Sequence, residues 1–183
     1  MKLYKLLSAV TRSAELESEW LDLLSLLEYV GCRKIIKSVS YGQISRDVLR
    51  HISDEASHAF LLKILAERIG EKCEFSNRRL SVSGWDYFQG VDLSVSSLLP
   101  SDSYRAVSYI IEQRVLDVYP KYLELTTSPE VKRVLHQILS QEKNHGAAFC
   151  RGLFPSDKIL EMHAIENSHW DRFLSAASLM LGI

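Results

Sequence analysis

The chain has 183 residues, of which 46% are hydrophobic and 25% charged, and its formal net charge is −1. This composition predicts one globular domain over residues 1–183, and the balanced charge gives no field that would attract nucleic acid or an anionic membrane surface. The three cysteines form neither a CxxC pair nor an even disulfide set, which favours a reducing compartment. Because no apolar run reaches the ~20 residues of a membrane span, we expect a cytoplasmic protein.

Two long helices are predicted in the first half of the chain. The first covers residues 13–39, where Ser13 is a suitable N-cap and acidic residues occupy the first turns, as the helix dipole favours. Its apolar residues recur every three or four positions until SVSYGQ at 38–43 breaks the pattern. The second covers residues 44–69 with the same spacing and stops at Gly70, a residue type that often ends helices.

Residues 70–102 show no sustained period and are predicted to form a long connection. A short helix within residues 85–99 is the only regular element expected there. Because loops of this length are uncommon inside a compact domain, the segment should serve a specific purpose.

Three further helices are predicted, over residues 103–125, 129–151 and 157–181. Pro120 is expected to kink or break the first of them, whereas Pro129, after the N-cap Ser128, fits the first turn of the next. Two helical hairpins with tight turns, joined by one long connection, predict an all-α fold. Its four-helix bundle has a core at about 13–151, a single crossover at 70–102 and an additional C-terminal helix at about 157–181.

The second and fourth helices carry the same pair of side chains at the same spacing. Glu55 and His58 in one, and Glu142 and His145 in the other, stand three residues apart and therefore side by side on one helical face. Both pairs fall on the apolar stripe that should face the core, where a carboxylate is costly unless it is paired or binds a metal.

The first and third helices each offer a glutamate at the matching depth. Glu28 and Glu55 are almost equally far from the turn that joins their helices, and so are Glu112 and Glu142. Four glutamates can bridge two divalent ions and offset their charge, while two histidines give each ion a nitrogen donor. Such ligands, with no thiolate, suit iron or manganese better than a structural zinc ion.

This ligand pattern, on a bundle with one long crossover, resembles the ferritin-like di-iron carboxylate superfamily, and most closely its rubrerythrin and bacterioferritin branch. The resemblance covers about residues 13–151 and implies two bound iron ions, or a manganese–iron pair. It implies these metal ligands, with Glu55 and Glu142 as bridges: Glu28, Glu55, His58, Glu112, Glu142 and His145. The chain lacks the paired CxxC motifs of a rubredoxin-like module, and residues 44–69 lack the methionine with which bacterioferritin holds haem.

A few other residues near these positions are candidates for supporting roles. His51, one turn before the pair on the second helix, is a candidate donor to a metal ligand, with plain core packing as the alternative. Tyr109 and Tyr119 share a face with the glutamate of the third helix. Core packing is the default expectation for both, and a redox relay beside oxidising iron is the alternative. A third Glu-x-x-His copy, Glu166 and His169, has no matched glutamate and is expected to be structural.

The function expected from this constellation is that of a non-haem di-iron oxidoreductase that activates dioxygen or peroxide and takes electrons from an external donor. An organic molecule that is hydroxylated or desaturated in the pocket, or Fe(II) itself, would fit these ligands as substrate. One alternative is an iron-binding or ferroxidase protein without an organic substrate. Another is a metal-free helical interaction module, whose carboxylates form ion pairs with Arg33, Lys34 or Arg114. The C-terminal helix is a candidate surface for a homodimer.

Overall fold

The computed structural model describes residues 2–39, 44–71, 79–150 and 154–183, except for the side chains of residue 79 and residues 143–150. Within these ranges the chain is almost entirely helical and contains no strand. The helices are α1 (Lys2–Val10), α2 (Ala14–Val39), α3 (Arg46–Gly70), α4 (Arg79–Leu98), α5 (Ser103–Leu125), α6 (Pro129–Cys150) and α7 (Ser156–Leu181), with a short 3₁₀ turn at Pro100–Asp102.

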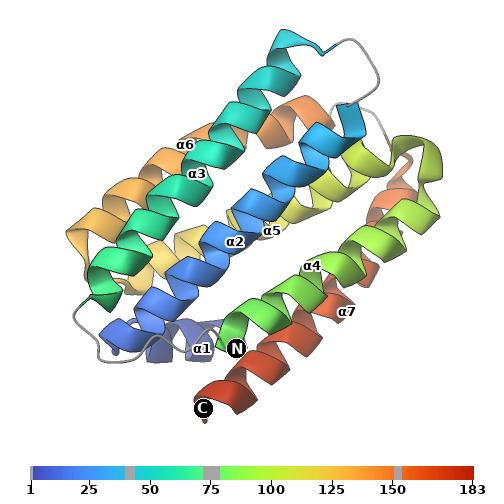
Figure 1. Cartoon of the computed structure of the whole chain (residues 1–183). Coiled ribbons are helices and arrows are strands. Elements are labelled where there is room, and N and C mark those ends of the chain that lie inside the picture. Colours follow the sequence, from blue (N-terminus) through green and yellow to red (C-terminus); the bar gives the residue numbers. More distant parts are fainter. Residues whose placement is uncertain (1, 40–43, 72–78, 151–153) are drawn as a thin grey trace.

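Four of the helices form a bundle. α2 packs against α3 and α5 packs against α6, and the two hairpins meet through contacts of α3 with α6 and of α2 with α5 (Figure 1). α4 lies in the connection between α3 and α5, and it packs on both α2 and α5. α7 runs beside α4 on the same side of the bundle, whereas α1 contacts α2, α5 and α7.

The helix starts follow the capping residues of the sequence. The Ser13 hydroxyl oxygen accepts a hydrogen bond from the backbone N–H of Leu16 at 3.3 Å, and Ser128 accepts one from Val131 at 3.3 Å. These bonds satisfy N–H groups that have no partner within the first turn of a helix. Helices α2, α3, α5, α6 and α7 lie within a few residues of their predicted ranges, although the N-cap residues of α5 and α7 form no side-chain hydrogen bond.

The segment at 70–102 is the main correction to the sequence-based prediction, because α4 is a full helix of 20 residues. Its buried apolar side chains are Leu80, Tyr87, Phe88, Val91 and Val95. Leu80, Tyr87, Val91 and Val95 follow one another at intervals of seven, four and four residues, which places them on one helical face. Serine and glycine separate them and hide the pattern, because both residue types have low helix propensity. Packing against α2, α5 and α7 supplies the stability that propensity does not.

Two further local differences have physical explanations. α5 continues through Pro120 without a break, although proline removes a hydrogen bond at a cost of about 3 kcal/mol. Val118, Tyr119 and Tyr122 are all buried beside it, so tertiary packing holds the helix together. The unpredicted α1 is a short amphipathic helix whose Leu6 is completely buried.

Aromatic side chains fill the space between the bundle and the α4–α7 pair. Trp20 of α2 meets Tyr122 of α5 edge to face, with ring centres 6.4 Å apart. Tyr87 of α4 lies 5.3 Å from Trp170 of α7, which stacks on Phe173 at 5.0 Å. These contacts hold α4 and α7 onto the bundle.

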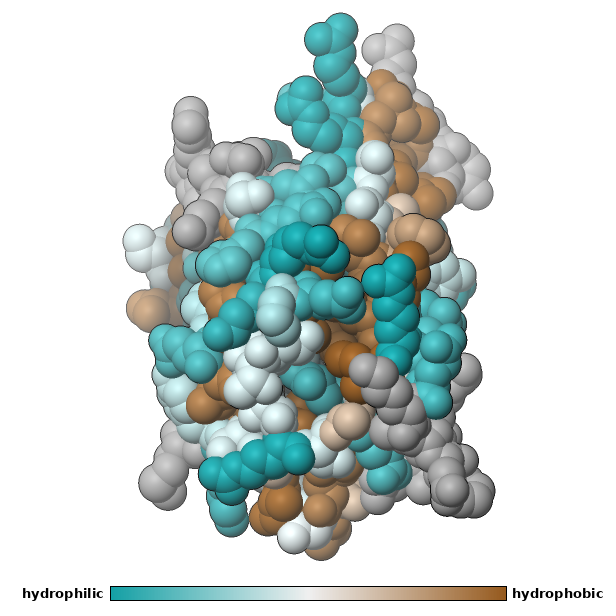
Figure 2. Space-filling view, turned by 90° about the vertical axis from the view of Figure 1, so that its left-hand side faces the viewer, coloured by the Kyte–Doolittle hydropathy of each residue, from teal (hydrophilic) through white to brown (hydrophobic). Residues whose placement is uncertain are grey.

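The surface is mixed in character. Figure 2 shows apolar side chains (brown) between polar ones (teal) on the face turned toward the viewer. No helix in the described part of the chain combines the length and the apolar character needed to cross a membrane.

Candidate metal centre

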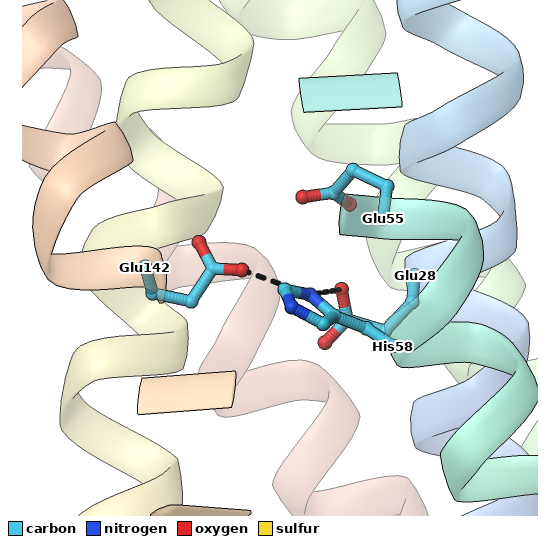
Figure 3. Close-up of side chains that lie close together, drawn as sticks. All are labelled: Glu28, Glu55, His58 and Glu142. Carbon is cyan, nitrogen blue, oxygen red and sulfur yellow. Dashed lines mark ion pairs between the residues drawn. The ribbon is translucent and has the colours of Figure 1, made fainter. Parts of the chain in front are cut away.

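The four bundle helices bring buried acidic side chains and histidines to one level. Glu28 comes from α2, Glu55 and His58 from α3, Glu112 from α5 and Glu142 from α6, and none is more than 8% exposed. Figure 3 shows four of them, with the His58 ring between the carboxylates of Glu28 and Glu142. The structure therefore brings these five side chains, which the sequence predicts as metal ligands, to one level of the bundle.

Four of these residues are close enough to hold one ion. One donor atom from each of Glu28, Glu55, His58 and Glu142 lies within 4.8 Å of the others. His58 Nδ1 is 3.0 Å from Glu142 Oε1 and 3.6 Å from Glu28 Oε2. Because carboxylate and imidazole ligands bind at about 2.0–2.2 Å from a metal, opposite ligands of one ion stand roughly 4 Å apart. The group needs little contraction to reach that spacing.

His51 extends the cluster toward α5. Its Nε2 lies 3.2 Å from Glu55 Oε1 and 3.5 Å from Glu112 Oε1, and its Nδ1 lies 3.2 Å from the hydroxyl of Tyr104. In the sequence, the one signal for this contact is the position of His51 one turn before Glu55 on the same stripe. Its proximity to Glu112, on a different hairpin, depends on how the two hairpins dock.

His145, the remaining predicted ligand, lies outside the described side chains. Its backbone belongs to α6, one turn beyond Glu142. The structure leaves its role as a prediction.

Small residues bring α2 and α3 together at the cluster. A Cβ atom on Gly31 would stand 2.9 Å from Glu55 Oε2, so glycine makes room for this carboxylate. On the same face of α2, Ser18, Ser25 and Cys32 follow one another at intervals of seven residues. Ser18 and Ser25 donate hydrogen bonds of 2.7 Å to the backbone carbonyl oxygens of α3 residues 66 and 59, and the Cys32 thiol lies 3.6 Å from that of residue 52.

Burial and mutual repulsion raise the pKa of two glutamates. The pKa of Glu112 rises to about 9, mainly through burial and then through the nearby Glu142 and Glu28. Burial, followed by the charge of Glu28, also raises the pKa of Glu55 well above its usual range. Burial alone would lower the pKa of His58, but its contacts with Glu142 and Glu28 raise it to about 10. The residues thus retain protons at neutral pH when no metal offsets the carboxylate charges.

The basic side chains that could have neutralised the cluster are bound elsewhere. Lys34 forms an ion pair with Asp92, and Arg114 forms one with Glu166 at 2.6 Å. The Arg33 guanidinium lies over a tyrosine ring of α2, 5.7 Å from its centre. These three basic residues therefore do not form the ion pairs with the cluster carboxylates that the metal-free alternative requires.

Glu112 gives the clearest test of whether a cation fits. Both of its carboxylate oxygens are buried, and neither accepts a hydrogen bond from the described residues. A buried carboxylate in this state is unfavourable by several kcal/mol unless it is protonated or coordinates a metal. The donor set of carboxylates and imidazoles, with no thiolate, fits iron or manganese.

The two candidate redox tyrosines occupy different surroundings. Tyr119 is buried and its hydroxyl donates a 2.5 Å hydrogen bond to Glu28 Oε1, and burial raises its pKa well above the usual range. Tyr109 packs instead beside Phe154 and His163, with ring centres 6.4 Å and 6.1 Å away. Of the two, Tyr119 is the one placed against the cluster.

The third Glu-x-x-His copy lies apart from the cluster, in the contact between α7 and its neighbours. Glu166 accepts hydrogen bonds from Tyr87 at 2.6 Å and from Arg114 Nε at 2.8 Å. His169 lies 3.3 Å from the Ser94 hydroxyl. These residues join α7 to α4 and α5.

Comparisons with protein-family models, with curated proteins and with solved structures find no match for this chain. The centre is therefore characterised by its own geometry: a buried cluster of glutamate and histidine side chains, from four helices, that is compatible with a di-iron site.

Proposed function

We propose that this chain is a non-haem di-iron oxidoreductase of the ferritin-like kind, which activates dioxygen or peroxide. The observation that carries the proposal is the buried cluster of four carboxylates and histidine, which comes from four helices and whose charge is not offset by Arg33, Lys34 or Arg114. Two sequential hairpins joined through a connection that crosses the bundle support the same assignment.

In this proposal Glu28, Glu55, His58 and Glu142 would hold one iron. Glu112 and His145 of α6, together with Glu55 and Glu142, would hold the second. When bound, the two irons supply redox chemistry toward dioxygen or peroxide, with electrons from an external donor.

The chain itself would hold and position these ligands. Tyr119 donates to Glu28 and fixes the orientation of that carboxylate. His51 stands between Glu55 and Glu112, where it can donate an N–H to either carboxylate and keep the two apart. The apolar walls of the bundle exclude bulk water from these side chains, which strengthens each electrostatic interaction.

The first test is the iron content of protein that is purified under mild conditions or loaded anaerobically with Fe(II). We expect about two irons per chain, in line with the two-ion ligand set, and dioxygen consumption on addition of a reductant. Glu55→Ala/Glu142→Ala should lose the iron while keeping its helical circular dichroism spectrum. Glu67→Ala, an exposed position on the same helix α3, is the matched control and should keep it.

The other outcomes separate the alternatives. Many irons per chain in a large oligomer, without consumption of an organic substrate, would assign the protein to iron handling. A folded protein that takes up no iron after anaerobic loading would refute the di-iron assignment.

A further inference from the structure

A cavity adjoins the carboxylate cluster, between the bundle and the α4–α7 pair. Its volume is about 80 Å³, and its wall includes Glu28 and Glu55 at the cluster end. The rest of the wall is mostly apolar and aromatic, with Leu27 from α2, Phe88 from α4 and Phe173 from α7. It is the space that α4 and α7 enclose when they pack on the bundle.

Away from the carboxylate cluster, the charged side chains of this wall are Lys34 and Arg114, and both are already paired. Lys34 is bound to Asp92. The Arg114 guanidinium donates to both carboxylate oxygens of Glu166, at 2.8 Å and 2.6 Å. A charged ligand would have to compete with these ion pairs inside a low-dielectric site, which is unfavourable.

The neutral polar side chains of the wall are engaged or covered as well. The Tyr87 hydroxyl donates to Glu166, and the Ser108 hydroxyl is hydrogen-bonded to Tyr104. The indole nitrogen of Trp20 is covered by neighbouring atoms, so a ligand in the cavity cannot reach it. Away from the cluster, a polar ligand would lose hydrogen bonds to water and gain none.

We propose that this cavity binds the small, neutral, apolar group of the substrate on which the metal centre acts, such as a short alkyl group. The substrate role rests on the proposed function. The cavity has about half the ~150 Å³ of an engineered apolar cavity that binds benzene or xenon, so it takes a group smaller than a benzene ring. Burying such a group against aromatic and aliphatic side chains is favourable by about 25 cal/mol per Å² of apolar surface.

The test uses xenon and isobutane as neutral probes and isobutyrate as the charged counterpart of isobutane. Methyl NMR spectra of the full chain, with and without metal, report where each probe binds. We expect saturable shifts of the Val107, Val115 and Leu27 methyl groups with xenon and isobutane, and none with isobutyrate. All three side chains belong to the cavity wall.

Cavity-filling variants show whether the shifts arise from this space. Val115→Phe should abolish binding of both neutral probes, whereas Leu123→Phe, on the same helix α5 and outside the cavity wall, should not. Leu27→Phe repeats the test from α2 if Val115→Phe does not fold. Shifts that survive both filling variants, equal binding of isobutyrate, or no saturable shift in the folded chain would overturn the proposal.

The result is independent of the metal. Probe binding by a chain that takes up no iron would keep the apolar binding site and refute the di-iron function, and with it the substrate role. Iron uptake without probe binding would keep the centre and refute the apolar substrate.

Discussion

Glu112 shows what the cluster requires at the level of single residues. Its carboxylate is buried, accepts no hydrogen bond from the described residues, and has a pKa of about 9. The side chain is therefore protonated at neutral pH in the metal-free protein and ionised when it coordinates a metal. Metal and protons compete for the same oxygen atoms.

This competition predicts that metal binding releases protons. Because the pKa values of Glu112 and His58 are about 9 and about 10, both residues must lose a proton to act as ligands at neutral pH. The affinity for anaerobic Fe(II) should therefore rise steeply between pH 6.5 and pH 9. Isothermal titration calorimetry in two buffers of different ionisation enthalpy measures the protons released. An affinity that does not change over this range would contradict the prediction.

The same pKa shift makes Glu112 destabilising for the metal-free fold. Above pH 4.5 the unfolded chain loses this proton while the folded chain keeps it to about pH 9, so the free energy of unfolding falls as pH rises between those values. Glu112→Gln should stabilise the metal-free protein at pH 8 by about 1–3 kcal/mol and much less at pH 5. It should also lower the iron content.

Urea unfolding of wild type and variant at both pH values measures this effect. Glu67→Gln, at an exposed position, is the control and should show no such pH-dependent gain. A loss of stability in Glu112→Gln at pH 8 would mean that the carboxylate has a stabilising partner in the folded chain.

At Gly31, the residue that favours helix stability differs from the residue that favours metal binding. Alanine at this position should favour α2 by about 1 kcal/mol, because glycine is a poor helix former. Its Cβ would stand 2.9 Å from Glu55 Oε2, the mobile end of a side chain, so the carboxylate shifts instead of the backbone. We expect Gly31→Ala to unfold at a higher temperature when metal-free, yet to bind Fe(II) about tenfold more weakly, since outer contacts of ligands have effects of this size. Unchanged affinity would show that Glu55 can relocate freely.

The sequence can identify residues whose relative position depends on one hairpin alone. It cannot identify contacts that depend on how two hairpins pack together. Depth along a hairpin follows from counting residues, so Glu28 and Glu55 could be matched. The contact of His51 with Glu112 depends on the docking of one hairpin against the other, which no periodicity records.

At the level of elements, replacement of a glycine in α4 by alanine should change the stability of the protein in the opposite direction to Gly31→Ala. A Cβ on Gly84 would lie 2.0 Å from Leu23 Cδ1, in a contact between two packed helices. Gly84→Ala should therefore destabilise the protein by about 1–3 kcal/mol through overpacking, although helix propensity alone predicts a gain. Thermal unfolding measures whether Gly84→Ala raises or lowers the stability. Ser97→Ala, at an exposed position of α4, is the control.

Helix α4, which the sequence did not predict at its full length, is stabilised mainly by packing against neighbouring helices. The long helices α2, α3, α5 and α6 carry clear apolar stripes, α2, α3 and α6 also begin with capping serines, and their ranges were predictable. α4 is rich in serine and glycine, and its two glycines at close contacts serve packing against Leu23 and His169. The expectation that residues 70–102 serve a purpose fits the position of α4 beside the cavity, whereas the expectation of a loop was wrong.

For the whole molecule, the two hairpins are the units that the proposed metals would join. Removal of iron by a chelator should lower the free energy of unfolding, because a ligand that binds only the folded state stabilises it by an amount that grows with the logarithm of the free ligand concentration relative to Kd. At free metal of about 100 to 1,000 times Kd the stabilisation is about 3–4 kcal/mol. Differential scanning calorimetry before and after chelation measures it. Equal melting temperatures in iron-loaded and chelated samples would contradict it.

The row of hydrogen bonds between α2 and α3 also bears on the order of assembly. Ser18, Ser25 and Cys32 face backbone carbonyls of α3 at regular intervals, so this hairpin has its own register before α5 and α6 exist. During synthesis we therefore expect Glu28, Glu55 and His58 to come together before Glu112 and Glu142 reach them. Protonation or metal binding would then offset the carboxylate charges as the second hairpin docks on the first.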